Sequence, residues 1–132
     1  MGQMIRFHTE LECYRRAFEA AMQLFETSKT FPKEECYSLT DQGRRSSRSV
    51  CANLAEAWRK RRYRAAFLSK LNDAEAEAAE TQTWIEFAVR CGYLDAAIGR
   101  GIYTEYDAVL GMITAIIREP DSWLLPTTPA RR

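Results

Sequence analysis

The chain is poor in the two residues that interrupt helices. Four prolines occur in 132 residues, at positions 32, 120, 126 and 129, and there are only six glycines. Neither residue occurs between Gly43 and Gly92. Proline removes a backbone donor and clashes with the preceding turn, so its absence permits long helices. No window alternates apolar and polar side chains well enough for a β-strand. The sequence therefore predicts an all-α fold.

Residues that bind metals are also scarce. His8 is the only histidine, and no two cysteines form a CxxC pair. Structural zinc sites use four cysteine or histidine ligands at close spacings, and a di-iron bundle needs repeated Glu-x-x-His motifs. We therefore expect no metal and no cofactor. Free thiols are the simplest interpretation of the four cysteines, Cys13, Cys36, Cys51 and Cys91.

Motifs for catalysis are missing as well. The chain has no glycine-rich phosphate loop and no G-x-S-x-G, and the acids Glu75, Glu77 and Glu86 point in different directions on a helix. We expect that the protein is not an enzyme. No run of 18 apolar residues could cross a membrane, and Met1–Glu10 lacks the apolar region of a signal peptide. We therefore expect a cytoplasmic location.

Charge is unevenly distributed, although the net charge is only +1. Residues 44–70 hold nine basic residues and one acid, a net of +8, whereas residues 71–89 hold five acids and no base, a net of −5. A uniformly solvated surface would mix the two signs. The segregation indicates a basic surface beside an acidic one, and two copies could pair through such surfaces.

The pattern of residues 38–64 indicates an amphipathic helix with two different sides. Ser38 with Asp41 three residues later resembles a capping box, which predicts a helix start. One apolar face follows at helical spacing: Leu39, Gly43, Ser46, Val50, Leu54, Ala57 and Trp58. The opposite polar face is either a solvated surface or a contact with another helix or subunit. The candidates for such a contact are Arg45, Asn53, Glu56 and, further along the chain, Glu80.

Three more helices follow from periodicity and caps. Thr9 with Glu12 predicts the start of the first, with a buried stripe of Leu11, Tyr14, Phe18, Ala21, Phe25 and Ser28. The third has the stripe Phe67, Leu71, Ala74, Ala78, Thr81, Ile85 and Ala88, and Gly92 ends it. Asp95 caps the fourth, whose stripe is Ile102, Tyr106, Val109, Ile113 and Ile116, widened by Ile98, Leu110 and Ile117.

The break between the second and third helices is the least marked. The heptad register continues from Gly43 to Ile85, but one long helix would bury Lys60 and Arg64. We therefore place a turn near Lys60–Arg64 and expect helices at 9–31, 38–60, 65–91 and 95–118. Short connectors make consecutive helices antiparallel. The predicted fold is an antiparallel up-and-down four-helix bundle, one domain over residues 1–132 with a tail from about 119.

Several stretches resemble one family in the right order. The run from Tyr37 to Glu56, Y-x-L-T-D-Q-x-R-R-x-x-x-S-V-x-A-N-L-A-E, is similar to the signature of the bacterial four-helix-bundle family first met in intervening sequences of 23S rRNA genes. The chain departs from that family at Ala57, where glycine is common, and at Ala76-Glu77. Other matching stretches are Cys13–Ala17, Lys29–Glu35, Glu80–Gln82 with Ala88, Gly92–Leu94, Tyr106-Asp107, Pro120 and Trp123.

The resemblance implies an antiparallel bundle that assembles as a ring, commonly a homopentamer. One relative is the accessory protein of diversity-generating retroelements, which binds nucleic acid and a reverse transcriptase. The family carries no known catalytic residues, so none are assigned to this chain. Expected partners are therefore further copies of the chain, RNA or DNA, and a reverse transcriptase or another protein.

A basic turn, residues 58–64, is the strongest functional candidate. Guanidinium groups neutralise phosphates, and exposed aromatic rings stack on bases. Two alternatives stay open: the turn is merely solvated, or the protein is a self-assembling scaffold that binds a protein and no nucleic acid. The candidate nucleic-acid-binding residues are Arg44, Arg48, Arg59, Lys60, Arg61, Arg62 and Arg64.

Overall fold

A computed structural model describes residues 5–126 as an all-α protein. The four α-helices are α1 (Glu12–Ser28), α2 (Leu39–Arg59), α3 (Arg64–Arg90) and α4 (Ala96–Arg118). Two single-turn 3-10 helices, η1 (His8–Glu10) and η2 (Lys33–Glu35), precede α1 and α2. No strand occurs in the described residues, which confirms the predicted fold class.

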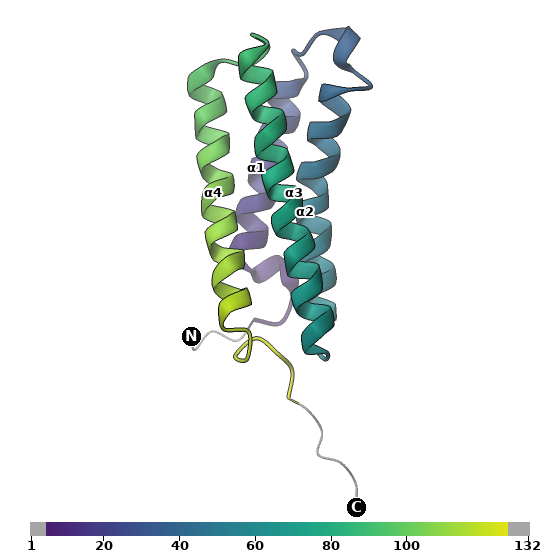
Figure 1. Ribbon diagram of the computed structural model, residues 1–132, viewed down its shortest axis with the longest axis vertical. Helices are drawn as coiled ribbons and strands as arrows, with labels where there is room; N and C mark the ends of the chain where they lie inside the picture. Colours follow the sequence, from purple (N-terminus) through teal and green to yellow (C-terminus); the bar gives the residue numbers. More distant parts are fainter. Residues whose placement is uncertain (1–4, 127–132) are drawn as a thin grey trace, which may run out of the picture.

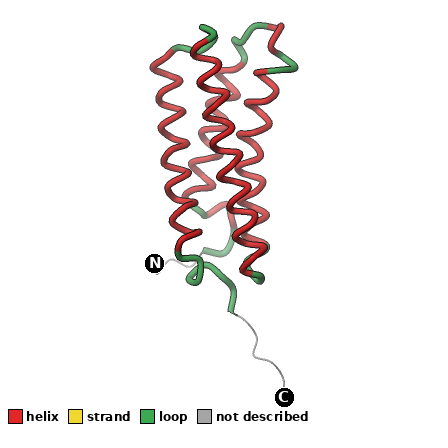
Figure 2. The backbone as a smooth tube through the Cα atoms, in the orientation of Figure 1, coloured by secondary structure: helices red, strands yellow, loops and turns green. Residues whose placement is uncertain are grey.

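The helices run alternately up and down, as Figure 1 shows. Each packs against its two neighbours in a square: α1 against α2 and α4, and α3 against α2 and α4. Within residues 5–126 the diagonal helices make no close backbone contact. The α2–α3 turn, the start of the described chain and the C-terminal segment after α4 all lie at one end of the bundle (Figures 1 and 2).

The core lies along the predicted faces of three helices. Every residue of the predicted stripes of α2 and α3 is buried, and so is the main stripe of α4. Tyr106 in α4 is the largest fully buried side chain. Ile98 was predicted to widen this stripe, but that prediction was wrong, because its side chain is 46% exposed. It lies in the first turn of α4, at the edge of the bundle end.

The predicted stripe of α1 was right at its two ends, Leu11 and Ser28, and wrong by one residue between them. Its buried residues are Cys13, Ala17, Ala20, Leu24 and Ser28, whereas Phe18 is 44% exposed. Small side chains face the neighbouring helices, which lets the backbones approach closely. The larger rings lie at the edges of the helix, where Phe25 meets two cations from α2. Sequence periodicity favoured the rings because burying them removes more apolar surface from water.

Two of the three predicted N-terminal caps differ from the structure. Asp95 accepts from the backbone N–H groups of Ala97 and Ile98, as predicted. Ser38 precedes α2 but its side chain does not cap it, because the carboxylate of Glu35 accepts from the Leu39 N–H and from the Ser38 hydroxyl. Thr9 lies inside η1, and α1 begins three residues later than predicted, at Glu12.

Both turns around α3 are where the sequence placed them. Lys60 follows α2, and its N–H donates to the carbonyl oxygens of Glu56 and Ala57. Residues 60–63 form the turn. At the other end Gly92 has a φ of +80°, a conformation that strains any residue with a Cβ atom. Among the described residues, no helix combines the length and apolar character needed to span a membrane.

Candidate nucleic-acid interface

The basic turn brings three unpaired cations to the surface. Arg59 ends α2, Lys60 follows it and Arg62 lies in the turn, and all three side chains are exposed. None makes an ion pair or side-chain hydrogen bond with another residue of the described chain. Tyr63, next to them, is 66% exposed, so its ring is open to stacking. This part of the turn has the surface chemistry expected for binding phosphates and bases.

Arg61 is held by the protein instead. Its guanidinium carbon lies 3.5 Å from the centre of the Trp58 ring, and its Nε donates to the Trp58 carbonyl oxygen at 2.8 Å. One terminal nitrogen also donates to the carbonyl oxygen of Trp123 at 3.4 Å. Burial, and then the charge of Arg59, lower the pKa of Arg61. Arg61 is thus partly withdrawn from solvent.

Trp58 itself is buried and joins both ends of the described chain. Its Nε1 donates to the carbonyl oxygen of Arg6 at 3.1 Å, and its ring meets that of Trp123 edge-on at 6.4 Å between centroids. Its side chain is 5% exposed. The indole therefore cannot stack on a base in this structure, and Tyr63 is the exposed ring of the turn.

The C-terminal segment crosses the basic turn. The N–H of Leu125 donates to the carbonyl oxygen of Arg61 at 3.1 Å, and Arg64 forms an ion pair with Asp121. Residues 123–125 of this segment are apolar. Nothing in the sequence identified Asp121 as a partner of Arg64, because 57 residues separate them.

Arg44 and Arg48 lie elsewhere on α2. The Arg44 Nε donates to the Ser28 hydroxyl at 2.8 Å, and the guanidinium carbons of Arg44 and Arg48 lie 4.8 and 5.7 Å from the centre of the Phe25 ring. Arg48 precedes Arg59 by 11 positions, about 16 Å at the α-helical rise. The structure therefore separates the seven candidate residues into two groups.

Of the four candidate residues for a contact with another helix or subunit, only one forms an ion pair or side-chain hydrogen bond with another helix in the described chain. Arg45 pairs with Asp41, Asn53 donates to Ser49, and Glu80 accepts from Trp84, so these contacts stay within their own helices. Glu56 differs, because the Lys70 Nζ lies 2.8 Å from its carboxylate and joins α3 to α2. The hydrogen bond from Lys70 lowers the pKa of Glu56.

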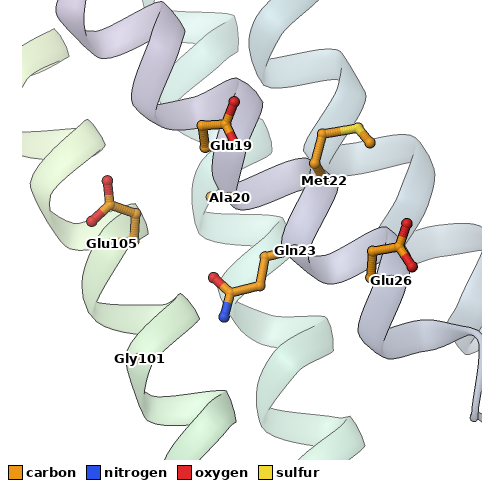
Figure 3. A pocket seen from close by; sticks show the side chains of 7 residues that line it. All are labelled: Glu19, Ala20, Met22, Gln23, Glu26, Gly101 and Glu105. Atoms are coloured by element: carbon orange, nitrogen blue, oxygen red, sulfur yellow. The ribbon is translucent and has the colours of Figure 1, made fainter.

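The groove between α1 and α4 is lined by acidic side chains, in contrast to the basic turn. Figure 3 shows Glu19 and Glu26 on α1 and Glu105 on α4 around it. Arg16 holds Glu105 by two hydrogen bonds, of 2.7 and 3.1 Å. Carboxylates repel phosphate, so this groove is unsuited to nucleic acid. Within the described residues no group of three or more metal-ligating side chains is close enough to hold a metal ion.

Another surface feature lies at the far end of the bundle. Tyr37, just before α2, is 93% exposed, and Phe87 on α3 is 52% exposed. A shallow hollow between them is lined by Leu39 and Trp84. The predicted stripes contain neither Tyr37 nor Phe87, and the exposure of Tyr37 depends on the connector before α2.

Comparison with known proteins places this bundle in a family. A crystal structure of a protein with unknown function from the S23 ribosomal protein family of Bacteroides thetaiotaomicron is similar, with a TM-score of 0.72 and 28% sequence identity. The match covers 80% of this chain and 95% of that one. No curated protein matches. The model of the 23S rRNA-intervening sequence protein family matches residues 9–115, and the chain belongs to that family.

Proposed function

We propose that the protein is a non-catalytic accessory factor that binds RNA or DNA through the phosphates. The contacts come from Arg59, Lys60 and Arg62 of the basic turn. One observation carries the proposal: three neighbouring exposed cations without a protein partner in the described chain. Exposed cations that form no close ion pair in the described chain are available to displace the counterions of a phosphate backbone.

The start of α3 supports the same assignment. Its N-cap, Tyr63, makes no side-chain cap, and the first turn of α3 contains no acid. The first N–H groups of a helix and its positive dipole end attract anions. A phosphate beside Arg62 would meet these donors as well as the guanidinium.

The family description supports the choice of ligand without deciding it. It refers to sequences that interrupt 23S rRNA genes, which makes RNA a natural first ligand to test. Phosphate contacts carry no sequence information, so we expect weak sequence preference. Arg44 and Arg48 would extend the surface only for a ligand that follows α2 toward Phe25. A reverse transcriptase remains a candidate protein partner in an accessory role.

Charge reversal of the three exposed residues tests the proposal. The triple variant Arg59→Glu, Lys60→Glu, Arg62→Glu should abolish binding of a single-stranded RNA oligonucleotide at low salt while leaving helicity unchanged. The matched control is Arg15→Glu, Arg90→Glu, Arg100→Glu, which changes three exposed cations elsewhere and alters net charge equally. Equal binding by the two variants would contradict the proposal, and so would a parent protein that binds neither RNA nor DNA.

A scaffold function is the second candidate. The exposed rings of Tyr37 and Phe87, with Trp84 between them, favour a protein contact at the end away from the basic turn. In this proposal the protein forms a ring of identical subunits, five being the number that the family resemblance implies. Light scattering at micromolar concentration should give a multiple of the 15.2 kDa chain mass. A monomeric mass would contradict the ring.

A further inference from the structure

We infer that the C-terminal segment Glu119–Leu125, here called the strap, competes with nucleic acid for Arg61 and Arg64 of the basic turn. This inference rests on the proposed function and adds a regulation to the same site. In the strapped state the protein offers Arg59, Lys60 and Arg62 to phosphates. Release of the strap adds two guanidinium groups to that surface.

Three polar contacts and one ring contact place the strap on the turn. Asp121 pairs with Arg64, the Trp123 carbonyl oxygen accepts from Arg61, and the Leu125 N–H donates to the Arg61 carbonyl oxygen. The Trp123 ring lies edge-on against Trp58. A carboxylate on Arg64 occupies the group that a phosphate would bind, because both anions accept hydrogen bonds from the same guanidinium face.

The polar contacts of the strap are weak enough to be displaced. The side chains of Arg64 and Asp121 are 56% and 83% exposed, and an ion pair so open to water contributes little to stability. The bond from Arg61 to the Trp123 carbonyl is 3.4 Å long, near the upper limit for a hydrogen bond. Only Pro120 in this segment is buried. A polyanion can therefore exchange with the strap without unfolding the bundle.

Release also changes the local charge. Arg61 lies over Trp58 through contacts within its own turn, so it stays positioned when the Trp123 carbonyl leaves. The carboxylate of Asp121 moves away from Arg64 together with the strap. Because linkage is reciprocal, nucleic acid that binds Arg61 and Arg64 must favour the released state by the same factor.

Two neighbouring acids provide a matched test. Asp121→Asn removes the negative charge that pairs with Arg64, whereas Glu119→Gln makes the same charge change at an exposed side chain with no partner in the described chain. Binding of a fluorescent oligouridine RNA should tighten about twofold to fivefold more for Asp121→Asn than for Glu119→Gln, the range expected for one exposed ion pair. One further phosphate contact should steepen the salt slope of binding by about 0.7.

Two further readouts follow the ring contact of the strap. Trp123→Ala removes the ring contact and should also tighten binding, with helicity measured to confirm the fold. In the parent, RNA should shift tryptophan emission to longer wavelength as Trp58 and Trp123 become wetter. Equal affinities for Asp121→Asn and Glu119→Gln, or weaker binding by Trp123→Ala, would overturn the strap while leaving the proposed function intact. Failure of the parent and all three variants to bind would overturn both.

Discussion

The Arg61 guanidinium carbon lies 3.5 Å from the centre of the Trp58 ring, and the Arg61 Nε donates to the Trp58 carbonyl oxygen. One cation of the basic turn is therefore part of the fold, while its sequence neighbour Arg62 is exposed. A run of basic residues looks uniform in sequence. In space the run alternates between side chains that hold the bundle end together and side chains that face solvent.

Truncation of Arg61 should therefore change the stability of the protein more than truncation of Arg62. Arg61→Ala removes a cation–π contact and a hydrogen bond from a charged group, and should lower the free energy of unfolding by about 1–3 kcal/mol. Arg62→Ala should change it by less than about 0.5 kcal/mol, as is usual at exposed positions. Urea unfolding of both variants measures the difference. Equal stabilities would show that the contact with Trp58 contributes nothing.

Two glycines of α4 should respond oppositely to alanine. A Cβ atom at Gly99 would lie 2.5 Å from a methyl group of Val89, whose branched side chain has little freedom to move. Gly99→Ala should destabilise the protein by about 1–3 kcal/mol. Gly101 has open space at that position, so Gly101→Ala should stabilise it by up to about 1 kcal/mol through helix propensity. Thermal unfolding checks both signs, and destabilisation by Gly101→Ala would contradict the packing described here.

The four cysteines should divide into two reactive and two protected thiols. Cys36 and Cys91 are exposed, whereas Cys13 and Cys51 are buried, and burial raises the pKa of each buried thiol to about 11. The thiolate is the reactive species, so both buried groups are protected by access and by pKa. A thiol reagent at pH 8 should modify two groups rapidly and four after denaturation. Rapid modification of three or four in the native protein would contradict the α1–α2 packing.

The stability of the protein should depend on pH through the carboxylate of Glu35. The Ser38 hydroxyl, the Tyr93 hydroxyl and the Leu39 N–H donate to its carboxylate and lower its pKa. The resulting stability is present above the ordinary glutamate pKa of about 4.3 and is lost as pH falls through the lowered value. The melting temperature of Glu35→Gln should therefore lie below that of the parent at pH 7, and the difference between the two melting temperatures should narrow below about pH 4.

Glu34→Gln is the control, because Glu34 is exposed and its carboxylate accepts no hydrogen bond from the described chain. Its melting temperature should follow that of the parent across the same pH range. A difference in melting temperature between Glu35→Gln and the parent that does not change with pH would contradict a stabilising role for the charge of the Glu35 carboxylate.

Helix periodicity predicted most of the fold because apolar burial acts locally along each helix. The stripes of α2 and α3 were predicted residue by residue, and Lys60 and Arg64 were enough to place the turn. The face of α1 was wrong because Ala17 and Ala20 pack closely while Phe18 lies outside. Which residue faces a neighbour depends on the distance between backbones, and the sequence of a single helix does not contain that distance.

The candidate site was predictable in kind and less so in detail. The run of basic residues identified positions 58–64, but the structure adds contacts of Arg61 with Trp123 and of Arg64 with Asp121. Those contacts join positions about 60 residues apart, so no local pattern contains them. The cap of α2 shows the same limit, because Glu35 reaches Leu39 from outside the predicted capping box.

The salt dependence of binding tests the central claim most directly. If Arg59, Lys60 and Arg62 each neutralise one phosphate of a single strand, the logarithm of the association constant should fall with the logarithm of salt concentration with a slope of about −2. The triple glutamate variant should lose this dependence together with the binding. A parent slope near zero, or an unchanged slope and affinity in the triple variant, would contradict phosphate binding by the basic turn.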